Sequence, residues 1–191
     1  FGGFPYFLHT YNKTRDMRRT NGKQGEIKSQ QLICGLFDAT ITHISKNGKY
    51  DFKALLPDGV SKTFEVKTEP KAITQYGGFS VEIGHKQNSY ITEYIVRKPF
   101  IWDNTKVVRT GLSESEADFY IFHDDKKQYY IISSKKLKQW LDDIDMSRIV
   151  WGGYQKHTLQ VQIRLNELEE LGHYIDLRKK RGKKTSTEAK A

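Results

Sequence analysis

Residues 50–68 read YDFKALLPDGVSKTFEVKT, and this stretch decides the fold. Two runs rich in apolar and β-branched residues, roughly Tyr50–Leu56 and Lys62–Thr68, flank the sequence Pro57-Asp58-Gly59, which is typical of a tight turn. The pattern predicts two strands joined as an antiparallel hairpin. We expect a loop of odd length or a bulge, because any other connection would turn one strand's side chains to the opposite face.

Elements of both kinds surround the hairpin. A short amphipathic helix is predicted over Gly25–Leu36 and a strand over Phe37–Ile44, and a fourth strand follows at Phe79–Ile83. Residues 84–108 are interpreted as an insertion of loop and strand. The later pattern predicts a short helix beginning at Ser113, strands near 119–122, 129–132 and 159–165, and helices over 134–143 and 166–171. The mixture lacks a regular βαβα order, so we expect an α/β or α+β protein with a mixed central sheet flanked by helices.

Length and composition bound the class of protein. The 191 residues suffice for one domain, which we expect over residues 25–175, between a basic and aromatic N-terminal arm (1–24) and a basic disordered tail (176–191). No apolar run is long enough to cross a bilayer, so no membrane partner is expected. Cys34 is the only cysteine, which excludes an intramolecular disulfide and fits the cytoplasm of a bacterial or phage-infected cell.

The charge balance points to polyanions. Lysine and arginine number 32 against 23 acidic residues, giving a formal net charge of +9. Basic side chains set against phosphates release counterions, so nucleic acid is a favoured partner.

The hairpin also carries the candidate chemistry. Glu65 and Lys67 are two positions apart in a strand, so their side chains share one face. On a solvent face they would form an ordinary exposed ion pair. In a cleft they would supply a metal ligand and a cation. With a three-residue loop at Asp58–Val60, Asp51 would lie across from Lys67, and Lys53 across from Glu65.

Asp58 is the alternative acid, because it follows a proline directly. It sits in the turn, seven positions from Glu65, which is over about 20 Å of extended chain, so we interpret it as a turn residue. Asp51 and Glu65 together can hold Mg²⁺, with Mn²⁺ as a substitute, since hard cations prefer oxygen ligands. Such an ion activates a water molecule, which Lys67 would orient or deprotonate unless it pairs with the phosphate.

Asp51, the hairpin and the triplet Glu65-Val66-Lys67, following a helix with Glu26, resemble the PD-(D/E)XK nuclease superfamily. The similarity extends over about residues 25–135 and is greatest to small phage-type and Holliday-junction-resolvase-like endonucleases. Tyr50-Asp51 stands where many members have Pro-Asp. The resemblance implies a restriction-endonuclease-like core, with 25–175 as the nuclease domain, and a Mg²⁺-dependent endonuclease acting on DNA. A homodimer is expected if the chain is resolvase-like.

Two further carboxylates are candidates. By the resemblance, Glu26 is an additional catalytic acid or water ligand. Glu82 lies between Val81 and Ile83 in an apolar strand, where a buried carboxylate needs a partner. It is a candidate metal ligand beside Asp51 and Glu65, or a member of a structural hydrogen-bond network. The histidines lack the spacing of zinc ligands.

Two basic groups are candidates for DNA binding. They are Lys13, Arg15, Arg18 and Arg19 in the arm, and Lys135 and Lys136 at the start of the helix over 134–143. Phosphate contacts of this kind position a protein without reading sequence. The alternatives to a DNA endonuclease are a non-catalytic nucleic-acid-binding protein on the same fold and an RNA-directed nuclease.

Overall fold

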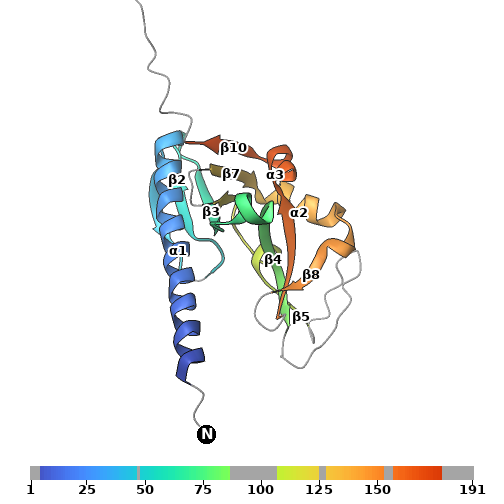
Figure 1. The fold of residues 1–191 in the computed structure, drawn as a ribbon. Helices are drawn as coiled ribbons and strands as arrows, with labels where there is room; N and C mark the ends of the chain where they lie inside the picture. The colour runs from blue at the N-terminus through green and yellow to red at the C-terminus, as the bar shows by residue number, and fades with distance from the viewer. Residues whose placement is uncertain (1–4, 47, 87–106, 125–127, 153–156, 178–191) are drawn as a thin grey trace, which may run out of the picture.

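The protein is a mixed α/β structure with two β-sheets (Figure 1). The computed structural model describes residues 5–46, 48–86, 107–124, 128–152 and 157–177, with residues 5–20 as a backbone path. The helices are α1 (Pro5–Phe37), α2 (Ser134–Asp143), α3 (Leu165–Leu171), the π-helix η1 (Ala72–Tyr76) and the 3-10 helices η2 (Gly111–Ser113) and η3 (Met146–Arg148). The strands are β1 (Thr40–Ile44), β2 (Phe52–Leu55), β3 (Ser61–Thr68), β4 (Gly78–Lys86), β5 (Val107–Arg109), β6 (Phe119–His123), β7 (Gln128–Ser133), β8 (Ile149–Gly152), β9 (Thr158–Arg164) and β10 (His173–Asp176).

The larger sheet is mixed and has the order β1-β2-β3-β6-β7-β10. Strands β1, β2 and β3 form the expected antiparallel meander, and β6 lies parallel to β3. Strands β7 and β10 continue the sheet in antiparallel pairing. The smaller sheet has the order β5-β4-β9-β8 and is antiparallel throughout. The expected mixed central sheet with flanking helices is therefore confirmed.

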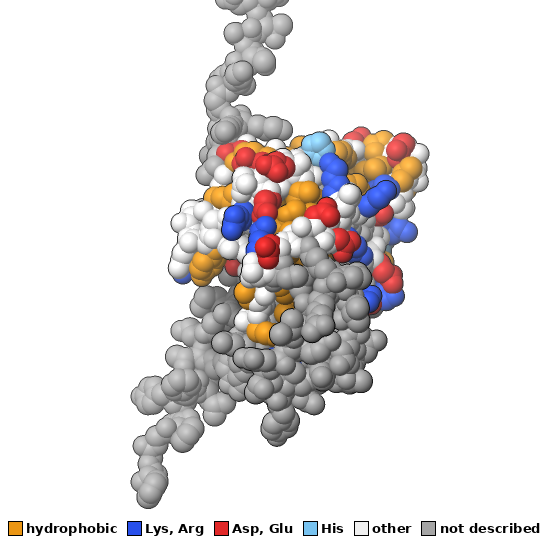
Figure 2. Space-filling model, turned by 90° about the vertical axis from the view of Figure 1, so that its right-hand side faces the viewer, with side chains coloured by type: hydrophobic (Ala, Val, Ile, Leu, Met, Phe, Trp, Pro, Cys, Tyr) orange, Lys and Arg blue, Asp and Glu red, His pale blue; other side chains and the backbone are white. Residues whose placement is uncertain are grey.

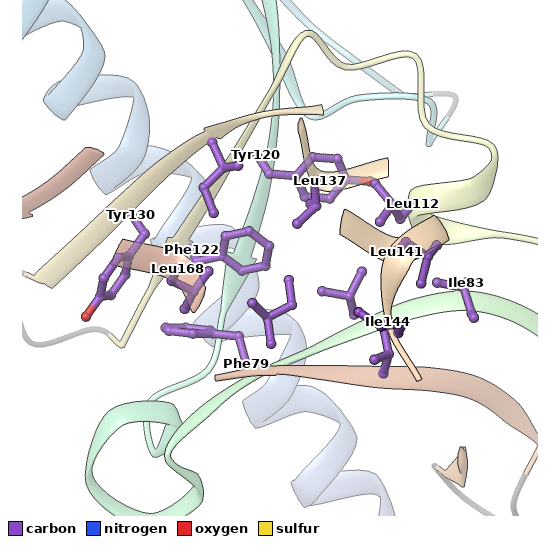
Figure 3. Packing of buried hydrophobic residues seen from close by; sticks show 14 of the residues in the cluster. Phe79, Ile83, Leu112, Tyr120, Phe122, Tyr130, Leu137, Leu141, Ile144 and Leu168 are labelled. Atoms are coloured by element: carbon purple, nitrogen blue, oxygen red, sulfur yellow. The ribbon is translucent and has the colours of Figure 1, made fainter. Parts of the chain in front are cut away.

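Two cores lie on opposite faces of the larger sheet, and successive side chains of β3 point to alternate faces. Phe64 and Val66 pack in the core that contains Leu32 and Ile33 of α1. The opposite face meets the second core, which the smaller sheet, α2 and α3 complete, with Tyr120 and Phe122 of β6 inside it (Figure 3). Glu65 and Lys67 therefore belong to the face that is turned away from the α1 core.

Helix α1 is longer than the sequence pattern predicts. The expected segment Gly25–Leu36 is helical, but the helix begins at Pro5 and passes through the expected boundary between residues 24 and 25. Its C-terminal half packs on the sheet through Leu32 and Ile33, and a helix nucleated there extends one hydrogen bond at a time into a segment with no apolar periodicity. In the part of the chain that is described, neither α1 nor another helix is apolar and long enough to span a membrane.

The β2–β3 hairpin has the expected odd loop, but in a different register. Leu56 and Val60 close it through the Leu56 amide, which donates to the Val60 carbonyl at 2.9 Å, so the loop is Pro57-Asp58-Gly59. Gly59 takes a positive φ of 81°, and Asp58 accepts the Val60 amide at 2.9 Å, as a turn residue does. Lys53 therefore lies opposite Thr63, and its predicted pairing with Glu65 is wrong.

Several elements differ from the sequence prediction. Ser113 ends the 3-10 helix η2 and does not begin an α-helix; its hydroxyl donates to the Ile83 carbonyl at 2.7 Å and so does not act as a helix cap. Strands β8 and β10 were not predicted, and β4 and β9 pair with each other in a sheet of their own. The expected insertion contributes Gly84–Lys86 to β4 and Val107 and Val108 to β5, and its residues 87–106 lie outside the described chain. The tail expected from residue 176 begins with the last residue of β10, and its residues 178–191 also lie outside the described chain.

Candidate active site

Glu65 and Lys67 form a close ion pair on one face of β3. The Lys67 Nζ lies 2.6 Å from the Glu65 Oε1, and the side chains are 31% and 12% exposed, respectively. A pair with one carboxylate nearly buried is unlike the solvent-screened pairs typical of protein surfaces. The partial burial of both side chains therefore disfavours the alternative of an ordinary exposed pair on a solvent face.

Asp51, the residue just before β2, lies close to this pair. Its amide donates to the Phe64 carbonyl at 2.8 Å although Phe52 is the register partner of Phe64, so two consecutive residues face one, as at a β-bulge. The Asp51 Oδ2 then accepts the Val66 amide at 2.6 Å. The Asp51 carboxylate thus accepts the hydrogen bond that the Val66 amide would give to a backbone carbonyl if β2 continued past this point. The predicted pairing of Asp51 with Lys67 is wrong, but the carboxylate still lies beside Glu65-Val66-Lys67.

The charge of Glu65 acts on both Asp51 and Glu26. Burial, followed by the charge of Glu65, raises the pKa of Asp51 to about 7, while the Val66 amide and Lys67 oppose the shift. Burial, followed again by Glu65, raises the pKa of Glu26, while Lys23 and Lys67 oppose it. Burial and the charge of Glu65 therefore disfavour the charged forms of Asp51 and Glu26, and a cation placed near them would relieve that repulsion.

Glu26 reaches the cluster because α1 approaches the sheet very closely at the preceding residue. A Cβ atom on Gly25 would collide with Thr68 Oγ1 and His123 Nε2. The Thr68 Oγ1 and His123 Nε2 atoms are hydrogen-bonded to each other at 2.8 Å, which links β3 to β6. The absence of a side chain at Gly25 therefore permits the contact that holds Glu26 next to the end of β3.

Tyr120 is a neighbour of the cluster that the sequence did not reveal. It is the register partner of Glu65 on the parallel strand β6 and is fully buried. Burial, together with the charges of Glu65 and Asp51, raises the pKa of its hydroxyl, which stays protonated. Only the pairing of β3 with β6 brings Tyr120 here, and a long-range pairing of this kind has no local sequence signal.

Glu82 is not brought to the cluster. Val81 and Ile83 are buried in the core between the sheets, so Glu82 is turned to the other face of β4. Its Oε1 accepts a hydrogen bond from Thr110 Oγ1 at 2.5 Å. Glu82 is therefore a member of a structural hydrogen-bond network, the second of its two expected roles. Its strand, β4, belongs to the smaller sheet and not to the sheet that carries Glu65.

The candidate DNA-binding residues lie on two helices. Lys135 and Lys136 are exposed in the first turn of α2, where Ser133 caps the Lys136 amide at 3.3 Å. The face of the molecule toward α2 and β8 carries basic and acidic side chains intermixed (Figure 2). Lys13, Arg15, Arg18 and Arg19 lie in the N-terminal half of α1.

The donor set suits a hard divalent cation. Among the described residues, no group of three or more histidine, cysteine, aspartate and glutamate side chains is arranged to hold a metal ion. The Asp51 carboxylate accepts the amide of Val66, the residue next to Glu65, so Asp51 and Glu65 are nevertheless candidate oxygen donors, and the charge of Glu65 also acts on Glu26. Mg²⁺ is commonly bound by one or two carboxylates and completes its shell with water, so the residues fit such an ion.

Comparisons with known proteins yield one structural likeness and no family. No family model matches the chain, and no curated protein matches its sequence. A bacterial homing endonuclease, I-Ssp6803I, matches with 12% sequence identity over 76% of each chain and a TM-score of 0.42. A likeness of this size identifies no shared site residue.

Proposed function

We propose that this protein is a metal-dependent endonuclease that hydrolyses phosphodiester bonds in DNA. The observation that carries the proposal is the convergence of Glu26, Asp51 and the Glu65–Lys67 pair from α1, the start of β2 and β3. The partly buried Asp51 and Glu26, whose pKa values are raised by burial and by the charge of Glu65, are unfavourable for folding in their charged forms. Such an arrangement is characteristic of a site that binds a cation or transfers protons.

Each side chain has a defined role in this proposal. Asp51 and Glu65 would bind Mg²⁺, or Mn²⁺ in its place. When bound, such an ion activates a water molecule and offsets negative charge on the phosphate. Lys67, the more exposed member of its ion pair, would orient that water or contact the phosphate. Glu26, with its raised pKa, would hold or release a proton at the edge of the cluster.

The chain order of the elements supports the same function. A helix with Glu26, a three-stranded meander with Asp51 and the Glu-Val-Lys triplet, and a parallel strand β6 beside β3 follow the order expected of a restriction-endonuclease-like core. The net charge of +9 favours a nucleic acid as substrate. Lys135 and Lys136, with the arm residues, would hold its backbone, and a homodimer would place two sites on two strands.

A cleavage assay tests the proposal. Supercoiled plasmid and a branched DNA junction are incubated with the protein and Mg²⁺, Mn²⁺ or EDTA. We expect cutting with either metal, and a loss of at least about 100-fold in rate for Asp51→Asn, Glu65→Gln and Lys67→Met. Each substitution removes a proposed metal ligand or the cation that would stabilise the negative charge of the transition state. Asp58→Asn and Lys71→Met alter an exposed carboxylate and an exposed ammonium, and they should cut like wild type.

The outcomes separate the alternatives. Equal cutting by wild type, Glu65→Gln and Lys67→Met would remove the site assignment. Loss of cutting with Asp58→Asn but not with Asp51→Asn would show that Asp58 in the turn, and not Asp51, is the catalytic acid. Tight DNA binding without cutting in either metal would favour the non-catalytic binding protein. Cutting of RNA in preference to DNA would favour the RNA-directed nuclease.

A further inference from the structure

One face of the β1–β2–β3 meander is open beside the candidate site. Helix α1 covers the other face, where Phe52, Ala54 and Phe64 are buried in its core (Figure 1). The side chains between them point the opposite way, to the same side of the sheet as Glu65. They are all exposed or half-buried: Thr40, His43, Lys53, Leu55, Ser61 and Thr63. We call these six residues the open face.

The strand register connects the open face to the candidate active site. His43 pairs with Lys53, and Lys53 pairs with Thr63. Glu65 follows two positions after Thr63 in β3, so its side chain lies on the same face. At about 4.8 Å between strands and about 3.3 Å per residue, His43 lies roughly 12 Å from Glu65. A chain bound along the open face would therefore lead into the site.

His43 presents an aromatic ring on the open face, and Tyr50 supports that ring from one side. His43 is exposed, and its ring meets the ring of the half-buried Tyr50 edge to face, with centroids 6.1 Å apart and planes at 63°. Tyr50 packs in turn against the core between the sheets, and it directly precedes Asp51 in the chain. The contact restricts the His43 ring and leaves part of it accessible. An accessible aromatic ring is a surface on which a nucleic-acid base can stack.

The charge of the open face suits a polyanion. Lys53 makes it basic, and none of its six members is acidic. The two acidic side chains at its border are engaged in other contacts. The Glu116 carboxylate forms an ion pair with Lys49, and the Asp118 Oδ2 accepts the Thr63 amide at 2.9 Å. A phosphate beside Lys53 would therefore meet a cation and hydroxyl groups.

We propose that the open face binds an unpaired DNA strand beside the candidate active site, with a base stacked on His43 and a phosphate held by Lys53. This inference rests on the proposed function and names its substrate class, which is DNA with a single-stranded segment next to the cut. Bases inside a duplex stack on one another, whereas the bases of an unpaired strand can stack on a protein side chain. A sheet face that carries aromatic and basic side chains binds single strands in this way.

The chemistry of the open face favours a nucleic acid over a protein as its occupant. Leu55 is its single apolar member, at 38% exposed, whereas the centre of a protein–protein interface is apolar. Two copies of the chain paired along this face would also bring their Lys53 side chains toward each other without an acidic member to offset them. A DNA strand offers both the phosphate and the base that the open face can bind.

Binding without cleavage tests the stacking contact. Fluorescence anisotropy in EDTA measures the affinity for a 30-nucleotide oligothymidylate and for a blunt 30-base-pair duplex. We expect His43→Ala to weaken oligothymidylate binding by at least about fivefold and duplex binding by less than about twofold, because only the unpaired base loses its stacking partner. His43→Phe keeps a ring without the imidazole and should bind like wild type. His173→Ala removes an exposed histidine at the other edge of the same sheet and should change neither affinity.

The salt dependence of oligothymidylate binding tests the phosphate contact. Lys53→Met should make the slope of log K against log salt shallower by about 0.7, the value for one phosphate contact on a single strand. Lys62→Met is the matched control, because Lys62 belongs to the same hairpin but lines an apolar pocket with Phe37 and Phe64 on the α1 side. It should leave the slope unchanged. Thermal denaturation checks that each variant is folded.

Several results would overturn the inference. Binding by His43→Phe as weak as that by His43→Ala would exclude stacking, and equal losses for oligothymidylate and duplex would exclude an unpaired strand. Tighter binding of oligouridylate than of oligothymidylate would overturn the choice of DNA. Because binding is measured without metal, the open face can bind as expected in a protein that never cuts DNA, and only the proposed nuclease activity then fails. Conversely, cutting that depends on Asp51 and Glu65, with wild-type binding by His43→Ala and Lys53→Met, would leave the proposed function standing and remove the open face.

Discussion

Asp51 has an environment that favours its protonated form in the metal-free protein. The carboxyl is held by the Val66 amide at 2.6 Å, but burial and the neighbouring Glu65 raise its pKa from 3.8 to about 7. The folded state therefore binds the proton more tightly than the unfolded state. Stability from this group is fully present below about pH 4, is lost as the pH rises toward 7, and then levels off.

The first prediction concerns this pH dependence. In EDTA, the free energy of unfolding of wild type should fall between pH 4.5 and 7.5, and Asp51→Asn should fall less because the neutral amide no longer titrates. Urea denaturation at half-unit pH steps measures both. An Asp51→Asn profile parallel to wild type would show that another group governs the change.

At the scale of elements, the contact between α1 and the ends of β3 and β6 positions Glu26. An alanine in a helix is ordinarily more stable than a glycine by about 1 kcal/mol. At Gly25 that rule should reverse, since a methyl group would collide with Thr68 and His123. Crowding of this kind typically costs about 1–3 kcal/mol.

The second prediction compares two glycines of the same helix. Gly25→Ala should lower the free energy of unfolding and also reduce cleavage, because α1 must move away with Glu26. Gly35→Ala is the matched control, since nothing lies within 4 Å of its added methyl group, and it should be neutral or stabilising with unchanged cleavage. Chemical denaturation and the plasmid assay supply the two measurements. An equally stable Gly25→Ala would argue against the close approach.

At the scale of the whole molecule, a divalent cation bound by both Asp51 and Glu65 should stabilise the folded protein. An ion that binds only the folded state stabilises it by about 2.7 kcal/mol at one hundred times its dissociation constant. Asp51 precedes β2 and Glu65 lies in β3, so such an ion would join two strands and relieve the repulsion that Glu26 shares.

The third prediction is a metal-dependent rise in thermal stability. Mg²⁺ or Mn²⁺ should raise the Tm of wild type and of Lys67→Met, which keeps the carboxylates, but not that of Asp51→Asn or Glu65→Gln. Glu82→Gln should respond like wild type because Glu82 lies in the smaller sheet and accepts a hydrogen bond from Thr110. Differential scanning fluorimetry at several metal concentrations measures the shift. A response lost in Glu82→Gln and kept in Asp51→Asn would contradict the ligand assignment.

The sequence by itself determined several of the elements and the shared strand face of Glu65 and Lys67. Strand β3 and helices α2 and α3 follow from apolar periodicity, and the period of two in a strand places both charged side chains on one face. Only the tertiary structure decided what surrounds that pair. The bulge directs Asp51 to the Val66 amide, Gly25 admits Glu26, and β4 carries Glu82 into another sheet. Periodicity is local, whereas these placements depend on which distant segments pack together, and a single sequence contains no local signal for that choice.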